Sequence, residues 1–356
     1  MAEYTSLPAP EHSAGPLHQL SQSPHPTIHR FFDTSPVSPS GRLVALFQFS
    51  QDQHPPAPGE AGQVVVSDRT SGHVLWSSPT CAWDTQLGAQ VQWGRTDDEL
   101  LFNRMAVPSE TDPQARLHTK ASGLSDWEPF GVCVDVTRGT ERALDGPVYM
   151  ANPTTGQIVS PCLKRIAQVQ PGYGVVLPPE QRPQNRGFPE QDGVFLTDLD
   201  DGATRLLISL AEIARALPDT FQTLDPEAGG LYAFHTKWNQ QGTRLMVVLR
   251  WVAQDQGKAL SKSCLVTMAP DGTDLHTAIG FAAWQGGHHP NWCPDGDTIV
   301  MNLRNPKTPR RLVRPKRFLQ KLTNKLSLTR RLGLRYYSDV DALHLTRFRF
   351  DGSARP

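Results

Sequence analysis

Apolar and polar residues alternate along short segments of this chain, and turns rich in Pro, Asp or Gly separate the segments. In residues 42–49, for example, Leu43, Ala45 and Phe47 fall on one face of an expected strand, as a half-buried strand requires. Strand pairs built on a Pro, Asp or Gly turn occur five times, at residues 38–49, 93–104, 152–163, 238–250 and 293–304. Pairs of a second kind join two strands through a turn centred on a glycine, namely Gly72, Gly139, Gly202, Gly272 and Gly352.

The two kinds of strand pair follow one another in strict alternation. Each consecutive couple makes four short strands, which is the unit of a propeller blade. The pattern therefore predicts an all-β fold, a β-propeller of four-stranded blades with five blades visible in the sequence. We expect a single propeller domain over residues 28–356, preceded by a flexible arm over residues 1–27, which are rich in Pro, Ser and His. Radial packing of blades leaves a central channel mouth, where we expect the ligand site.

Two segments have helical spacing of apolar residues. One is residues 207–217, which Pro218 is expected to end. The other lies in residues 304–337, a basic helical insertion in the last blade with twelve Lys or Arg and no Asp or Glu between Arg304 and Arg335. Three interpretations of the insertion stay open: a clamp for polyanions, an anchor to an anionic membrane surface, or a solvated helix on the propeller rim. Its few aromatic residues argue against nucleic acid.

The cysteines and the hydropathy of the chain indicate the cellular compartment of the protein. The chain of 356 residues has five cysteines with no close pairing, and three of them (Cys133, Cys162 and Cys264) sit in apolar strands, where we expect buried thiols. A reducing compartment fits this better than a disulfide framework. No apolar run has the length of a signal peptide or of a transmembrane segment. We therefore expect a cytoplasmic protein, or a periplasmic or secreted one if a leader is missing.

Three parts of the chain resemble a known family. They are HRFFDTSPVSPSGR (residues 29–42), SPCLKRIAQVQPGYGVVLP (160–178), and the pair FHTKW (234–238) and QGGHHPNWCPDG (285–296). Together they resemble the propeller polysaccharide lyases, meaning the ulvan lyases and more distantly the oligogalacturonate lyases, while the SPSGR and CPDG turns are similar to those of TolB-like propellers. The resemblance implies seven blades, of which five are found here. It also implies β-elimination on an acidic, uronic-acid-containing polysaccharide or oligosaccharide.

That reaction has three chemical requirements. The substrate carboxylate must be neutralised, a base must take the adjacent proton, and an acid must protonate the leaving oxygen. The resemblance implies proton transfer by Tyr173, which lies between two glycines. Arg165 is the candidate for neutralising the carboxylate, because Arg holds carboxylates through paired hydrogen bonds, and Arg182 and Arg186 are equal alternatives. His118 is the remaining candidate for the base.

Other residues are candidates for contact with substrate. His29, Arg30 and Asp33 begin an inner strand, where they would line the pocket or form a hydrogen-bonded set that closes the blades. Gln285 and His288 are further substrate-binding candidates at the start of the last blade.

A metal set is also expected. His235, His289 and Cys293 precede inner hairpins of adjacent blades, and a set of two His and one Cys favours Zn over Mn or Ca. Gln285 with His289 is similar to the Mn ligand pattern of the oligogalacturonate lyases. A structural role for the divalent metal is as open as a catalytic one.

Two other functions are open as alternatives to polysaccharide lyase activity. The first is a non-catalytic TolB-like propeller that binds an acidic glycan or a protein partner. The second is a glycoside hydrolase, which needs two facing carboxylates; Asp33 offers one, and the sequence indicates no second.

Overall fold

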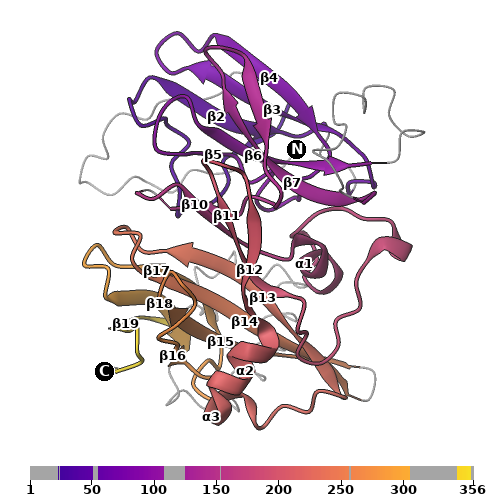
Figure 1. The fold of residues 1–356 in the computed structure, drawn as a ribbon, viewed down its shortest axis with the longest axis vertical. Coiled ribbons are helices and arrows are strands. Elements are labelled where there is room, and N and C mark those ends of the chain that lie inside the picture. The colour runs from indigo at the N-terminus through magenta and orange to yellow at the C-terminus, as the bar shows by residue number, and fades with distance from the viewer. Residues whose placement is uncertain are drawn as a thin grey trace, which may run out of the picture.

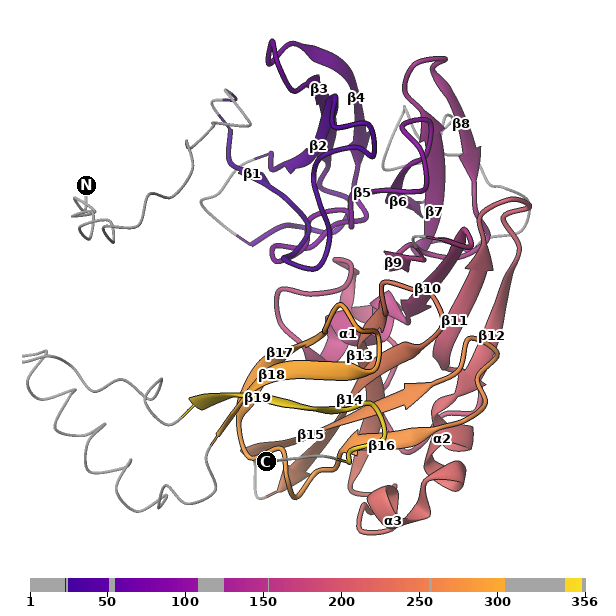
Figure 2. The same ribbon diagram turned by 90° about the vertical axis from the view of Figure 1, so that its left-hand side faces the viewer.

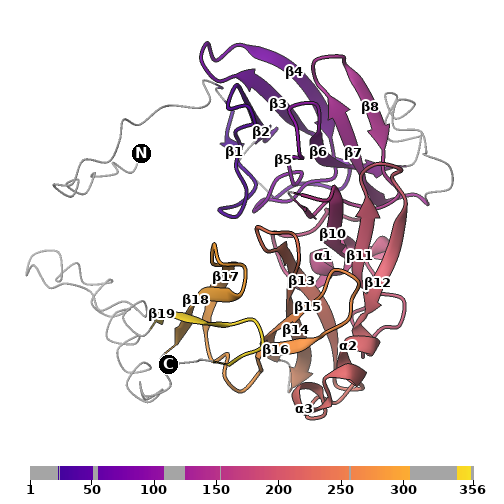
Figure 3. The same ribbon diagram turned by 60° about the vertical axis from the view of Figure 1, so that its left-hand side comes forward.

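The computed structural model describes residues 23, 25–50, 55–107, 125–152, 154–255, 258–304 and 343–353. Its strands form five antiparallel sheets, each made of strands consecutive in the chain. The sheets follow one another in chain order around a common axis, as Figures 1 and 3 show. The fold is an all-β propeller, and each sheet is one blade.

The strand bounds are as follows. Blade 1 contains β1 (Thr27–Ile28), β2 (Leu43–Gln48), β3 (Gly62–Asp68) and β4 (Val74–Thr80). Blade 2 contains β5 (Gln92–Trp93), β6 (Leu100–Ala106), β7 (Glu128–Asp135) and β8 (Thr140–Ala143). Blade 3 contains β9 (Met150–Ala151), β10 (Gln157–Pro161), β11 (Gly193–Asp198) and β12 (Thr204–Ser209). Blade 4 contains β13 (Gly229–Trp238), β14 (Leu245–Asp255), β15 (Lys258–Met268) and β16 (His276–Ile279). Blade 5 contains β17 (Gly287–Trp292), β18 (Thr298–Arg304) and β19 (Leu343–Arg349).

The predicted blade pattern is confirmed. Four sheets have four strands, and the fifth has three within the described residues. The turn-containing pairs expected at residues 93–104, 238–250 and 293–304 are the hairpins β5–β6, β13–β14 and β17–β18. Leu43, Ala45 and Phe47 are buried, as their alternation predicts. The two extra blades that the lyase resemblance implies have no counterpart among the described strands.

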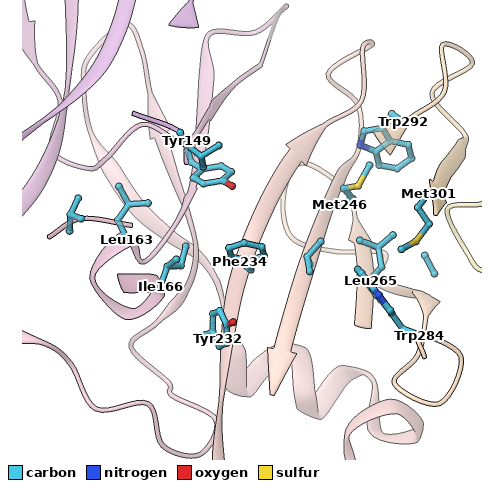
Figure 4. Close-up of a cluster of buried hydrophobic side chains, with 14 of the residues drawn as sticks. Tyr149, Leu163, Ile166, Tyr232, Phe234, Met246, Leu265, Trp284, Trp292 and Met301 are labelled. Atoms are coloured by element: carbon cyan, nitrogen blue, oxygen red, sulfur yellow. The ribbon is translucent and has the colours of Figure 1, made fainter. Parts of the chain in front are cut away.

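The core lies between the sheets as well as within them. One cluster of buried side chains reaches from blade 3 across β13 and β14 to blade 5, as Figure 4 shows. It includes Tyr149, Phe234, Met246, Leu265 and Trp292. Apolar clusters join neighbouring blades in chain order from blade 1 to blade 5, so the blades are held together by inter-blade packing.

Four short helical segments lie among the strands in the described part of the chain. They are α1 (Leu163–Val169), the 3₁₀ turn η2 (Pro179–Gln181), α2 (Leu210–Ala216) and α3 (Pro218–Phe221). The helix expected at 207–217 begins later than predicted, because Ser209 and Glu212 form a reciprocal capping box and the residues before it belong to β12. Pro218 opens α3 directly after α2. Helices α2 and α3 lie beside blade 4 (Figure 2).

Several predictions fall on residues that are not described. Most of the arm at 1–27, nearly all of the basic insertion at 304–337, and His118 lie outside the described residues. All five cysteines are described, and all are free thiols. In the part of the chain that the structure describes, no helix has the length and apolar character needed to cross a membrane.

Candidate functional site at the propeller axis

Strand β13 carries much of the candidate site along the axis. Its pairing with β14 is interrupted by an irregularity between Ala233 and His235. Such a bulge redirects side chains locally. The rings of Phe234 and His235 accordingly lie 3.8 Å apart between their centroids, and both are buried.

The loop that contains Tyr173 is held in a conformation that its glycines allow. Gly172 has φ +85° and Gly174 has φ +91°, a region that only glycine enters freely. A Cβ at Gly174 would lie 2.3 Å from the carbonyl oxygen of Leu163 in α1. The two glycines thus permit this backbone conformation, and the loop packs closely on α1.

A buried carboxylate fixes the same loop from the other side. Asp84, which is 2% exposed, accepts a hydrogen bond of 2.9 Å from the backbone N–H of Gly174. Its other oxygen accepts from the backbone N–H groups of Gln86 and Leu87. Burial raises the pKa of Asp84 to about 7, against the lowering effect of these hydrogen bonds.

A pocket of about 600 Å³ opens beside this loop, and we call it the GYG pocket. Its wall includes Pro55, Asp84, Tyr173, Leu177 and Arg182. Its size lies in the range of small-molecule sites.

Tyr173 connects the GYG pocket to the axis. Its ring lies edge-on to Phe234 at 4.9 Å and to His235 at 6.0 Å between centroids. Burial raises the pKa of Tyr173, so the phenol is protonated at neutral pH. The hydroxyl of Tyr149 is hydrogen-bonded to Nδ1 of His235 and points toward β13 in Figure 4. Burial lowers the pKa of His235 well below its usual value, so the imidazole is neutral.

Three charged side chains form an axial charge cluster. Asp33 lies 2.8 Å from Arg30 and 2.8 Å from Lys237, with all three side chains at most 3% exposed. Burial alone would raise the pKa of Asp33, but the two cations outweigh it and hold that pKa well below its usual range. Arg30 also donates to Gln90 of the connection between blades 1 and 2, at 2.8 Å.

The other predicted arginines differ in what they contact. Arg165 lies on α1, pairs with Asp192 and donates to the carbonyl oxygen of Gln184 at 2.7 Å, so it ties the long loop to the helix. Arg186 pairs with an acidic residue, Glu227, on the surface. Arg182 is exposed at the GYG pocket, and its Nε donates to the carbonyl oxygen of Leu177 at 3.2 Å.

The predicted metal ligands are not assembled. Among the described residues, no group of three or more His, Cys, Asp or Glu side chains is placed to hold a metal ion. Nδ1 of His235 is engaged by Tyr149, and the His289 ring packs edge-on against Phe31 at 5.6 Å. Cys293 begins the turn after β17. These residues as placed do not fit the expected zinc site.

The remaining predicted residues are more peripheral. Nε2 of His29 donates to the carbonyl oxygen of Thr34 at 2.6 Å. Gln285 is exposed, and its side chain donates to Ala282 at 2.8 Å. The His288 ring lies 4.2 Å from that of His289.

Sequence reasoning missed several residues of the site. Lys237 and Tyr149 contact predicted residues and Asp84 holds the loop of Tyr173 through Gly174, yet none of the three was singled out. A signal existed for Lys237, because a lysine between the largely apolar segment LYAFHT and Trp238 is expected to need a buried partner. Asp84 and Tyr149 carry no comparable local signal.

Comparison with known proteins gives fold-level similarity. No family model and no curated protein matches the chain. Among solved structures, a putative TolB from Agrobacterium tumefaciens is similar at 10% identity over 95% of this chain and 82% of that chain, with a TM-score of 0.39. Prolyl oligopeptidase B from Galerina marginata is similar at 10% identity over 88% of this chain and 39% of that chain, with a TM-score of 0.28. At these values the likeness says nothing about activity, and the propeller assignment rests on the five sheets.

Proposed function

We propose that this protein is a binding propeller whose GYG pocket holds the end of an acidic saccharide, with Arg182 as the group that meets the saccharide carboxylate. The observation that carries the proposal is the difference among the predicted arginines. Arg30, Arg165 and Arg186 each pair with a carboxylate of this chain. Arg182 has no carboxylate partner within the described residues and lines the pocket.

The pocket suits a saccharide in other ways. The half-buried ring of Tyr173 offers an aromatic surface beside Arg182. Asp84 adds little opposing charge, because its pKa of about 7 leaves it partly protonated at neutral pH and its oxygens are occupied by backbone N–H groups. A guanidinium held by its Nε keeps its terminal nitrogens for a bidentate contact with a carboxylate.

The test is calorimetric titration of the full chain with trigalacturonate and with the neutral, carboxyl-reduced trisaccharide. The Arg182→Gln variant is expected to bind trigalacturonate about ten- to hundredfold more weakly, since a charge-assisted hydrogen bond contributes about 1.5–3 kcal/mol. The matched control is Arg186→Gln, whose guanidinium pairs with Glu227 outside the pocket. Equal affinity of Arg182→Gln and the wild type, or no heat with trigalacturonate at all, would contradict the proposal.

A second candidate function is β-elimination at the same pocket. The observation that favours it is that Tyr173 and Arg182 line the same pocket, with the buried ring of His235 in contact with Tyr173. Elimination would require Tyr173 to act alone, taking the proton next to the carboxylate as a phenolate and returning it to the leaving oxygen, and its raised pKa works against the first of these steps. His235 is buried and hydrogen-bonded to Tyr149. It therefore contacts Tyr173 from the buried side and does not line the pocket.

Ultraviolet absorbance separates the two candidates. An unsaturated product released from trigalacturonate by the wild type, and lost in Tyr173→Phe, would establish elimination. Saturable binding without any product would leave the binding propeller as the function.

A further inference from the structure

A second cavity lies on the axis, and we call it the axial chamber. It has a volume of about 350 Å³, at the lower end of the range for small-molecule sites. Every blade or its entry segment contributes to its wall, through Asp33, Gln92, Met150, Trp238 and Trp292 among others. Residues from all five blades therefore meet a common space at this cavity.

The axial chamber is separate from the GYG pocket. The two walls share no residue. Along β13, His235 contacts Tyr173 of the GYG pocket, whereas Trp238 lines the chamber, about 10 Å further on at the rise of an extended strand. Lys237, between them, closes the axial charge cluster with Asp33. A ligand in one cavity would not touch a ligand in the other.

Three tryptophans line the chamber. Two of them donate an indole N–H hydrogen bond to a neighbouring blade, and the third does not. Trp93 of blade 2 donates its indole N–H to the carbonyl oxygen of Pro36 in the preceding blade at 2.9 Å. Trp292 of blade 5 donates in the same way to Lys237 of blade 4 at 3.2 Å. Trp238 of blade 4 is 2% exposed, and its indole N–H has no partner among the described residues. A buried donor without an acceptor is uncommon and requires an explanation.

The polar part of the wall carries no unpaired charge. The side-chain amides of Gln240 and Asn291 line the chamber, and neither has a hydrogen-bond partner in the described part of the chain. The charged residue of the wall, Asp33, is neutralised by Arg30 and Lys237. The chamber therefore offers indole surfaces and free amide donors and acceptors, but no free charge.

We propose that the axial chamber binds a neutral sugar of one or two rings. The apolar face of a sugar ring packs against indole, and its hydroxyls exchange hydrogen bonds with amides, which both donate and accept. A uronic acid would find no free cation here, and a purely aliphatic ligand would leave the amides of Gln240 and Asn291 unpaired. The proposal is independent of the function assigned to the GYG pocket.

The test is tryptophan fluorescence and calorimetry of the full chain, titrated with N-acetylglucosamine, cellobiose and maltose, and with galacturonate as the charged comparison. We expect a saturable change with at least one neutral sugar and none with galacturonate in the chamber. Asn291→Ala and Gln240→Ala are each expected to weaken neutral-sugar binding about tenfold, the effect of one hydrogen bond to an otherwise solvated group. Ala151→Phe, which adds a ring to the chamber wall, is expected to abolish it.

The controls separate the two sites. Arg182→Gln is expected to leave neutral-sugar binding unchanged, and Asn291→Ala is expected to leave trigalacturonate binding unchanged. If Ala151→Phe does not fold, the two amide variants still decide the question, because Gln240 and Asn291 are not part of the buried core. The proposal is overturned if none of the three neutral sugars binds, or if binding is the same in the wild type and both amide variants.

Discussion

Replacement of Lys237 by Met tests whether the axial charge cluster holds the ring together. The ammonium lies 2.8 Å from Asp33 and donates to the carbonyl oxygen of Pro290 at 3.1 Å, with the Lys237 side chain 1% exposed. Met keeps an unbranched side chain that is one atom shorter and removes the charge. It leaves Asp33 buried with Arg30 as its remaining cation, and Pro290 without this donor.

The magnitude follows from the burial of both partners. Removing one partner of a buried ion pair typically costs about 3–5 kcal/mol, because the other charge stays desolvated. Arg30 still compensates Asp33 in the variant, which places the expected loss of unfolding free energy near the lower end, at about 3 kcal/mol. The double variant Asp33→Asn with Lys237→Met should lose less than the sum of the two single variants, since the Asp33–Lys237 pair is then removed as a whole, while Arg30 lacks its carboxylate partner in both Asp33→Asn variants.

The measurement is equilibrium unfolding in urea, followed by tryptophan fluorescence and by circular dichroism. The matched control is Arg186→Met, because Arg186 and Glu227 form an ion pair whose side chains are 68% and 73% exposed, and exposed pairs contribute less than about 1 kcal/mol. A loss below about 1 kcal/mol for Lys237→Met, or additive losses in the double variant, would refute the view that the cluster is a tightly coupled buried unit.

Three further predictions concern the GYG loop and the residues behind it. Tyr149→Phe removes the hydroxyl partner of buried His235 and should lower the unfolding free energy in urea by about 1–3 kcal/mol; a neutral effect would mean that the contact contributes nothing. Gly174→Ala should lower both the affinity for trigalacturonate and the stability of the protein. The loss of stability should exceed about 1–2 kcal/mol, which is the cost of φ +91° for a non-glycine residue, because the added Cβ would also meet α1. Unchanged calorimetry and unfolding would contradict this. Burial raises the pKa of Asp84 to about 7, so between about pH 4 and pH 7 the folded state keeps a proton that the unfolded state releases. The contribution of this proton to stability is full at low pH and is lost as the pH rises through that window. The side chain at position 84 does not titrate in Asp84→Asn. The unfolding free energy of this variant, measured relative to that of the wild type, should therefore increase by up to about 1.4 kcal/mol per pH unit as the pH rises through this window. Parallel pH profiles would show that Asp84 is ionised throughout.

The blades were predictable from the sequence because their signals are local. Alternation with a period of two and turn residues between strands both act over a few positions, so each hairpin can be recognised alone. Helix α1 was missed for the opposite reason. It has seven residues and no side-chain cap, and it depends on burying Leu163 and Ile166 against other elements. A helix this short is stabilised by tertiary packing rather than by its own sequence.

The candidate site could be predicted in part. The sequence placed Tyr173, Arg30, Asp33 and His235 on segments that meet near the axis, and the structure brings them there. Which cation pairs with which carboxylate was not predictable, because pairing depends on distances between blades far apart in the chain. The expected zinc site illustrates this limit, since ligand types and spacing were suitable but the side chains contact other partners.

The segment from Arg30 to Asp33 explains how one stretch of chain can both close the ring and divide the channel. Closing a propeller requires contacts between its first blade and its last ones, and this segment supplies them: Asp33 pairs with Lys237 of blade 4, and Phe31 and Phe32 pack against His289 of blade 5. Asp33 lines the axial chamber, and Phe31 packs on His235, which contacts Tyr173 of the GYG pocket, so this segment lies between the two cavities. The lysine ammonium lies 4.5 Å from the centre of the Phe32 ring, which adds a cation–π contact to the ion pair. The stability of the ring and the separation of its two cavities therefore depend on the same few side chains.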